Sequence, residues 1–96
     1  MATILEEYIA KHPGSAQRYA EAAKLFPGGV THDTRYSTPF PLYMTHGSGP
    51  RKWDVDGNEY VDYVSGHGAL ILGHSHPAIA EAVSRQILRG THLGAS

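Results

Sequence analysis

Hydrophobic residues recur along this chain with two periods, which predict two kinds of element. Between residues 4 and 9 they lie four positions apart, and Thr3 and Glu6 have the spacing of a helix capping box. We expect a short helix here that stops before the first proline of the chain. A second helix is predicted from a cap at Ser15 to about Phe26, because small and aromatic residues again share one helical face.

Between residues 42 and 64 the pattern changes to short strands separated by turns. Asp56-Gly57-Asn58 is a strong turn signal within this stretch. The predicted strands are residues 42–46, 51–55 and 59–64. They form a three-stranded antiparallel meander in this prediction.

The register of the last two strands depends on the length of that turn. A two-residue turn would set Asp54 opposite Glu59, and like charges in this position destabilise a sheet. A three-residue turn instead pairs Trp53 with Val61 and Lys52 with Asp62. We favour this second register.

The stretch GHGALILGHSHP, residues 66–77, connects the meander to a third helix. Its glycines give the backbone freedom as it leaves the last strand, and residues 69–72 are expected to be buried. Pro77 suits the first position of a helix, which is predicted to run to about Arg89 with Gly90 as its stop. His74 to Pro77 is then the start of this helix.

These elements predict an α+β fold with three segments. The first segment, 1–40, holds the N-terminal helices and a loop; the second, 41–66, is the meander; the third, 67–96, is a glycine-rich connection and a helix. A meander with one unpaired face needs further elements to cover it, so we expect partner elements beyond residue 96.

Composition narrows the range of functions. The chain has 96 residues, a net charge of −1 and no cysteine, which argues against nucleic-acid binding, anionic membrane surfaces, disulfides and thiolate metal sites. The N-terminus carries charged residues where a signal peptide would be apolar, and the longest apolar run has four residues. We therefore expect a soluble, cytoplasmic protein with no nucleic-acid or membrane partner.

Several kinds of site are disfavoured by spacing. The glycines of residues 66–73 lack the third glycine of a dinucleotide fingerprint, and no Gly-Lys-Ser/Thr follows them. His74 and His76 are two residues apart, which is not the helical spacing of a zinc enzyme. Asp54-x-Asp56-Gly57 resembles the start of a calcium loop, but its glycine comes two residues early and the bidentate glutamate is missing. We expect no metal site.

Nucleophilic catalysis has no clear motif either. Neither Ser65 nor Ser75 lies in a Gly-x-Ser-x-Gly turn, although both are near histidines. Arg35, in an irregular loop, is the most interesting isolated charge and has only Asp33 as a nearby acidic residue. Arginines in loops are usually solvated, and binding of an anionic ligand is the alternative.

Residues 52–86, KWDVDGNEYVDYVSGHGALILGHSHPAIAEAVSRQ, resemble the N-terminal part of class III pyridoxal-phosphate aminotransferases. The shared features are the aromatic-Asp-x-Asp-Gly turn, Tyr-x-Asp, and Gly-His-x-His-Pro before a helix. Upstream, Phe26-Pro27-Gly28-Gly29-Val30 followed by Arg35 is similar to the glutamate-1-semialdehyde aminomutase branch and to related β-amino-acid aminotransferases. The resemblance extends from about Ser15 to Ser96.

This resemblance implies a fold-type-I enzyme that is several times longer and acts as a homodimer. Its cofactor, pyridoxal 5'-phosphate, would be bound by a lysine that lies far downstream in the family. Lys11, Lys24 and Lys52 do not match that lysine, and the segment that binds the cofactor phosphate would begin just beyond Ser96. The resemblance therefore implies an N-terminal fragment without catalytic or cofactor-binding residues, inactive by itself and forming the small-domain part of the enzyme.

Three residues match substrate-side positions of the family. Arg35 matches the arginine that binds the substrate carboxylate in the aminomutase-like branch. His67 matches a position on the substrate face of the cofactor where aminomutases usually carry tryptophan, and His32 replaces a small polar residue near the same pocket. These two departures favour an aminotransferase over an aminomutase.

The function implied is transfer of an amino group between an amino acid, perhaps a β-amino acid, and a keto acid. A glutamate-1-semialdehyde 2,1-aminomutase, which moves an amino group within one substrate, is the first alternative. A non-catalytic interaction module that kept only this segment of the family is the second.

Overall fold

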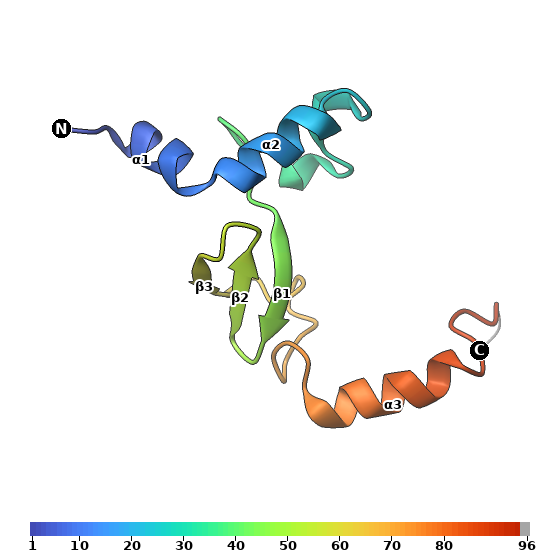
Figure 1. Ribbon diagram of the computed structural model, residues 1–96. Coiled ribbons are helices and arrows are strands. Elements are labelled where there is room, and N and C mark those ends of the chain that lie inside the picture. Colours follow the sequence, from blue (N-terminus) through green and yellow to red (C-terminus); the bar gives the residue numbers. More distant parts are fainter. Residues whose placement is uncertain (95–96) are drawn as a thin grey trace. The chain divides into compact units, whose positions relative to one another are not determined.

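The first helix begins at the predicted capping box. The computed structural model describes residues 1–94, and its first helix, α1, spans Ile4–Lys11 (Figure 1). The N–H of Glu6 donates to Thr3 Oγ1 at 3.1 Å, and the N–H of Thr3 donates to Glu6 Oε2 at 3.0 Å. This reciprocal pair satisfies two of the N–H groups that a helix start leaves without a partner, which confirms the prediction.

The second helix, α2, spans Pro13–Ala22 and differs from its prediction at both ends. Ser15 is not its cap: it is fully buried in the first turn, and its Oγ accepts the N–H of Tyr43 at 3.1 Å. Pro13 occupies the first turn, where its missing N–H costs no hydrogen bond. The predicted end near Phe26 is also wrong, because the chain turns after Ala22.

A carboxylate from elsewhere in the chain caps α2. Asp56 Oδ1 accepts the N–H of Gly14 at 2.6 Å, and Asp56 Oδ2 accepts the N–H of Ser15 at 3.2 Å. A negative charge at the start of a helix also interacts favourably with the helix dipole. The turn that follows β2 therefore fixes the place where α2 begins.

The predicted meander is confirmed as a three-stranded antiparallel sheet in the order β1-β2-β3 (Figure 1). The rings of His46 and Trp53 stack across β1 and β2, with centroids 4.8 Å apart. The strands are β1 at Met44–Ser48, β2 at Arg51–Asp54 and β3 at Glu59–Val61. The third strand is shorter than the predicted segment 59–64.

The predicted register of β2 and β3 is wrong. The N–H of Asp54 donates to the carbonyl of Asn58 at 3.1 Å, and the N–H of Asp62 donates to the carbonyl of Pro50 at 2.8 Å. Both bonds belong to one antiparallel register, which sets Trp53 opposite Glu59. The cause is the Asp54 side chain: its Oδ1 accepts the N–H groups of residues 56 and 58, both at 2.9 Å, and so sets the turn at residues 55–57, one position earlier than predicted.

Asp54 lies at the centre of a buried polar network. It is 2% exposed, and its Oδ2 accepts the Tyr60 hydroxyl at 2.8 Å. The Tyr60 oxygen lies 2.8 Å from Nε2 of His12, while Nδ1 of His12 donates to the carbonyl of Tyr8 at 2.6 Å. The amide of Asn58 donates both to Asp54 and to the carbonyl of Lys11. The junction of α1 and α2 is thus joined to the β2–β3 turn by hydrogen bonds.

This network shifts the pKa of its acidic groups. Burial acts to raise the pKa of Asp54, but hydrogen bonds from Asn58, Tyr60 and Asp56 outweigh it and hold that pKa below its ordinary value. Burial, and then the neighbouring Asp54, raise the pKa of the hydroxyl groups of Tyr8 and Tyr60. The network is therefore built around an ionised carboxylate and neutral phenols.

The chain divides into two compact units. The first comprises residues 1–46 and 52–60, and the second comprises residues 47–51 and the chain from residue 61 onward. Within residues 1–94, Phe40, at 7% exposed, is the single buried large hydrophobic residue; its ring lies 5.1 Å from that of Tyr8. Polar contacts rather than a large apolar core hold the first unit together. Residues 95–96, the end of the predicted segment 67–96, lie outside the described part.

The expected burial of residues 69–72 is wrong for this chain. Ile71 is 88% exposed and Leu72 is 53% exposed, and only Leu70 is half-buried. The second unit contains little other structure to cover them, because its strand segments are short.

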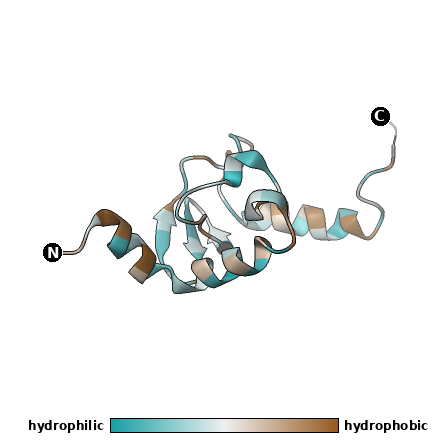
Figure 2. Ribbon diagram, turned by 90° about the horizontal axis from the view of Figure 1, so that it is seen from above, coloured by the Kyte–Doolittle hydropathy of each residue, from teal (hydrophilic) through white to brown (hydrophobic). Residues whose placement is uncertain are grey.

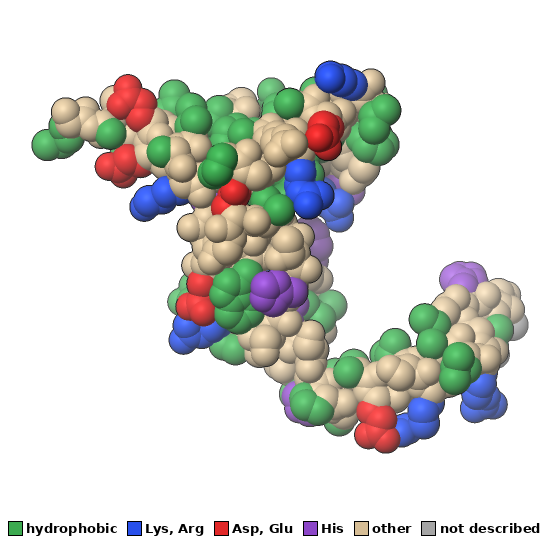
Figure 3. All heavy atoms as spheres, viewed as in Figure 1, with side chains coloured by type: hydrophobic (Ala, Val, Ile, Leu, Met, Phe, Trp, Pro, Cys, Tyr) green, Lys and Arg blue, Asp and Glu red, His purple; other side chains and the backbone are tan. Residues whose placement is uncertain are grey.

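The third helix, α3, spans Pro77–Ile87, close to its prediction. His76 caps it, with Nδ1 accepting the N–H of Ala78 at 3.3 Å, and Gly90 follows with a φ of +126°. Hydrophobic and hydrophilic residues alternate along α3 in Figure 2, and Figure 3 shows charged side chains gathered on one edge of it. The hydrophobic face, Ile79, Val83 and Ile87, is about half exposed.

Candidate functional site

The loop that carries Arg35 begins at a turn of two glycines. Pro27–Gly29 forms a short 3₁₀ turn after α2, in which the N–H of Gly29 donates to the carbonyl of Phe26 at 2.9 Å. Gly28 and Gly29 have φ angles of +66° and +73°. Other residues adopt this conformation with strain, so these two glycines allow the chain to reverse here.

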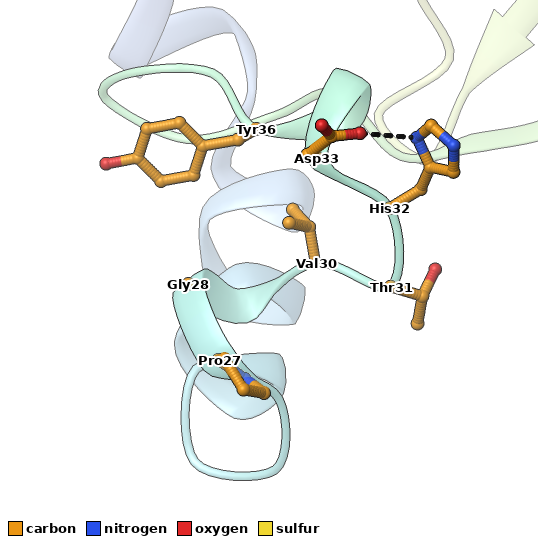
Figure 4. Close-up of a pocket in the computed structure, with 7 residues that line it drawn as sticks. All are labelled: Pro27, Gly28, Val30, Thr31, His32, Asp33 and Tyr36. Carbon is orange, nitrogen blue, oxygen red and sulfur yellow. Dashed lines mark ion pairs between the residues drawn. The ribbon is translucent and has the colours of Figure 1, made fainter.

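Arg35 ends a second 3₁₀ turn, Asp33–Arg35, which its own neighbours stabilise. Nδ1 of His32 accepts the N–H of Thr34 at 3.2 Å, and the N–H of Arg35 donates to the carbonyl of His32 at 3.0 Å. The same His32 nitrogen lies 3.1 Å from Asp33 Oδ1, the contact that Figure 4 marks. His32 therefore shapes the backbone from which Arg35 projects.

The guanidinium of Arg35 is anchored at one point. Arg35 is exposed, and its Nη1 donates to Thr31 Oγ1 at 3.1 Å. No acidic side chain within residues 1–94 forms an ion pair with it. Because a guanidinium has five N–H donors, this arrangement leaves two parallel donors for a carboxylate.

An open hollow of about 430 Å³ lies beside this loop. Arg35 is not part of its wall, but residues on both sides of Arg35 in the sequence are. Figure 4 shows the side chains of Tyr36 and His32 pointing away from each other on opposite sides, with Val30 between them. The wall is formed by Pro27, Gly28, Val30, Thr31, His32, Asp33 and Tyr36.

His67 belongs to the second unit, in a run of four residues with positive φ. The φ angles of Ser65, Gly66, His67 and Gly68 are +49°, +60°, +60° and +85°. The left-handed conformation is uncommon for residues other than glycine, and it places the His67 backbone in a strained state. The N–H of Gly68 donates to the carbonyl of Val64, and Asp62 Oδ1 accepts the N–H groups of Val64 and Ser65; these bonds hold the turn.

The predicted site residues therefore fall in two places. Arg35 and His32 share one short loop of the first unit, where His32 caps the turn that Arg35 ends. His67 is exposed in a strained turn of the second unit.

A partly buried acid–histidine pair, which the sequence does not predict, lies in the second unit. Nε2 of His74 is 2.6 Å from Asp62 Oδ2, and the side chain of Asp62 is 5% exposed. Backbone bonds between His74 and Gly49, 2.8 and 2.9 Å long, tie the connection to the β1–β2 turn. No periodic pattern links Asp62 to His74 in the sequence, so only their positions in a shared family motif could have indicated it.

A hollow of about 320 Å³ lies in the second unit. Asp62, Ser65 and His74 form part of its wall together with residues 49–50 and 70–73. His67 is not in this wall.

Metal ligands and lysines are two kinds of group that could give residues 1–94 a catalytic site. No group of three His, Cys, Asp or Glu side chains in this part of the chain could hold a metal ion. Lys11 and Lys24 are exposed, Lys52 is half-buried on β2, and none of the three lines either hollow. None of the helices in residues 1–94 combines the length and apolar character needed to cross a bilayer.

Comparison with known proteins places this arrangement in a family. Residues 33–95 match the family described as "Aminotransferase class-III". Over 84 residues the chain is 49% identical to a glutamate-1-semialdehyde 2,1-aminomutase from Methanocella arvoryzae. The alignment covers 88% of this chain and 20% of that protein.

Solved structures agree with the sequence match. A β-phenylalanine aminotransferase from Variovorax paradoxus is similar over 94% of this chain and 21% of that one, with 30% identity and a TM-score of 0.83. A structure titled "Transaminase with PLP bound" is similar over 98% of this chain and 20% of that one, with 39% identity and a TM-score of 0.78.

The chain thus spans about a fifth of the length of these proteins. Their similarity confirms the α+β fold as that of the N-terminal part of such enzymes. The chain belongs to the class III aminotransferase family.

Proposed function

We propose that the protein to which this chain belongs transfers an amino group between an amino acid and a keto acid. Membership in the class III family and similarity to solved transaminases support this proposal. The residues described here orient the substrate, and the bond-making groups lie in other parts of the protein.

One observation carries this role: Arg35 presents an exposed guanidinium that one hydrogen bond to Thr31 anchors and that no acidic side chain of residues 1–94 neutralises. A planar fork of donors binds a carboxylate through two parallel charge-assisted hydrogen bonds. Arg35 is the residue proposed to bind the carboxylate of the amino acid.

The cofactor proposed for the protein is pyridoxal phosphate, which a similar solved transaminase contains. This cofactor supplies an electron sink for the carbon that carries the amino group. The described residues do not fit its attachment, because Lys11, Lys24 and Lys52 all lie away from the two hollows. We assign cofactor binding to residues outside this chain.

His67 is proposed to contact the substrate. Its strained backbone is consistent with a functional position, since such conformations concentrate at sites of binding and catalysis. An imidazole there offers a polar group where aminomutases usually carry tryptophan. This difference favours an aminotransferase and, among its substrates, amino acids with the amino group at the β position.

The aminomutase is the second candidate, and the 49% identity to such an enzyme favours it. The two reactions differ in one requirement. An aminotransferase consumes a separate keto acceptor for each amino acid that it converts, whereas an aminomutase needs none. A non-catalytic interaction module, the third possibility, would turn over neither kind of substrate.

The test is an assay of the protein loaded with pyridoxal phosphate. With a β-amino acid as donor, we expect product only when a keto acid is supplied, in equal amounts of new keto acid and new amino acid. Conversion of glutamate-1-semialdehyde without an acceptor would instead establish the aminomutase. An absence of both activities, with the cofactor bound, would support the interaction module.

We also propose that the protein is a homodimer and that it is cytoplasmic. The lack of cysteine is compatible with a reducing compartment. Light scattering on the purified protein would measure the subunit number directly, and a monomer would contradict this part of the proposal.

A further inference from the structure

Tyr19, on α2, makes two contacts with the glycine turn that starts the Arg35 loop. Its hydroxyl donates to the carbonyl of Gly28 at 3.1 Å. Its ring lies so close to Gly29 that a Cβ atom on this glycine would be 2.5 Å from Tyr19 Cε1. Gly29 is buried, so the tyrosine ring and the turn are packed without space between them.

The other end of the loop returns to the same turn. Tyr36, the residue after Arg35, lies against Gly28, since a Cβ atom there would be 3.7 Å from Tyr36 Cδ2. Figure 4 shows Gly28 and Tyr36 on one side of the hollow, opposite Thr31 and His32. The carbonyl of Gly28 therefore accepts a hydrogen bond from Tyr19, and the ring of Tyr36 packs against the α-carbon of Gly28.

These contacts define the position of the Arg35 backbone. Arg35 is the last residue of the 3₁₀ turn that His32 caps, and the next residue, Tyr36, packs on Gly28. A shift of the glycine turn would move Tyr36, and Arg35 with it. Catalytic and binding groups tolerate only small displacements before their hydrogen bonds to a substrate weaken.

We infer that Tyr19 is a positioning residue for Arg35: by fixing the Gly28–Gly29 turn, it sets where the guanidinium meets the substrate carboxylate. This inference rests on the proposed role of Arg35 in carboxylate binding. Tyr19 itself faces the turn and not the hollow, so it acts through the loop and does not contact the substrate.

The decisive variant is Tyr19→Phe, which removes the hydroxyl and keeps the ring against Gly29. It is compared in the full, cofactor-loaded protein with Arg35→Ala and with the double variant. Two donors are used: an amino acid, and an amine of the same carbon skeleton without the carboxylate. Tyr8→Phe is the matched control, because it removes a 2.7 Å hydrogen bond from another helix to the carbonyl of Phe40, outside the turn.

For Tyr19→Phe we expect KM for the amino acid to rise about three- to tenfold, the effect of one lost hydrogen bond, with little change in kcat. The amine should react as before, and in the Arg35→Ala background the same change should have no further effect. Tyr8→Phe should leave the preference between the two donors unaltered.

If Tyr19→Phe lowers kcat/KM equally for both donors, or equally in the wild type and in Arg35→Ala, the inference is overturned and Tyr19 is a purely structural residue. Hydrogen exchange separates this failure from failure of the proposed function. Tyr19→Phe should speed exchange in residues 27–36 whatever Arg35 binds, and unchanged exchange there would overturn the inference. An Arg35→Ala enzyme with full preference for the amino acid would instead contradict the role of Arg35.

Discussion

At the scale of single residues, Asp54 joins several parts of the first unit through hydrogen bonds. One buried carboxylate accepts hydrogen bonds from the backbone of the β2–β3 turn, from the amide of Asn58 and from Tyr60, which in turn contacts His12. Each hydrogen bond to an ionised group contributes more than a neutral one. Much of the order in the first unit therefore depends on the charge of Asp54.

We predict that Asp54→Asn lowers the free energy of unfolding by about 2–3 kcal/mol at neutral pH. The folded-state pKa of Asp54 is lowered, so its contribution is complete above the ordinary pKa of about 3.9 and is lost as the pH falls through the folded value. The difference between the variant and the wild type should therefore shrink below about pH 4, as measured by urea unfolding at a series of pH values.

Asp33→Asn is the control for this experiment, because the Asp33 side chain is 94% exposed. It should change stability little at any pH. If Asp54→Asn lowers the free energy of unfolding by the same amount from acid to neutral pH, the role assigned to the charge is contradicted.

Residue-scale predictions from sequence succeeded where partners are close in the chain and failed where they are distant. The capping box of Thr3 and Glu6 is a contact over three positions and was predicted correctly. Ser15 was read as a helix cap, whereas it is the buried acceptor of Tyr43, which lies 28 positions away. Nothing in the local pattern distinguishes these two uses of a serine.

At the scale of elements, the start of α2 depends on the turn between β2 and β3. Asp56 is the link, since both of its carboxylate oxygens accept N–H groups from the first turn of the helix. A helix of ten residues gains little stability by itself and needs such contacts.

We predict that Asp56→Ala frays the start of α2 and lowers the free energy of unfolding by about 1–2 kcal/mol, as is typical for the loss of a helix cap. Hydrogen exchange should rise first at Gly14 and Ser15, whose N–H groups lose their acceptor. Glu7→Ala, in the exposed first turn of α1, serves as a control for removal of an acidic residue near a helix start. Unchanged exchange at Gly14 in Asp56→Ala would show that α2 does not need this cap.

The elements themselves were predictable, but their register was not. Hydrophobic period and turn residues located three helices and three strands within a few positions. The β2–β3 register was predicted from charge repulsion, whereas hydrogen bonds of the Asp54 side chain decide it. Such side-chain bonds to the backbone compete with the strand ladder and leave no hydrophobic signal.

At the scale of the whole molecule, this chain carries Arg35, the residue proposed to bind the substrate, and none of its three lysines lines either described hollow. Family membership and the order of the motifs were predictable from sequence, because the motifs follow one another at fixed spacing. The exposure of Ile71 and Leu72 was not, since an apolar run alone does not say what covers it.

We predict that residues 1–96 alone, mixed with pyridoxal phosphate and treated with borohydride, give no site-specific adduct. The three lysines lie outside both hollows, so we expect no one of them to be labelled selectively. Peptide mapping by mass spectrometry measures the labelling of each. Stoichiometric labelling of a single lysine would show that this chain holds the cofactor itself.

The central claim is that Arg35 binds the carboxylate of the substrate, and the ratio of kcat/KM for an amino acid to that for its carboxylate-free amine tests it most directly. In the cofactor-loaded protein, Arg35→Ala should lower this ratio about ten- to a hundredfold by reducing only the amino-acid value. Arg35→Lys should recover part of the loss, because it restores the charge without the planar fork. A ratio equal to that of the wild type in Arg35→Ala would contradict the claim.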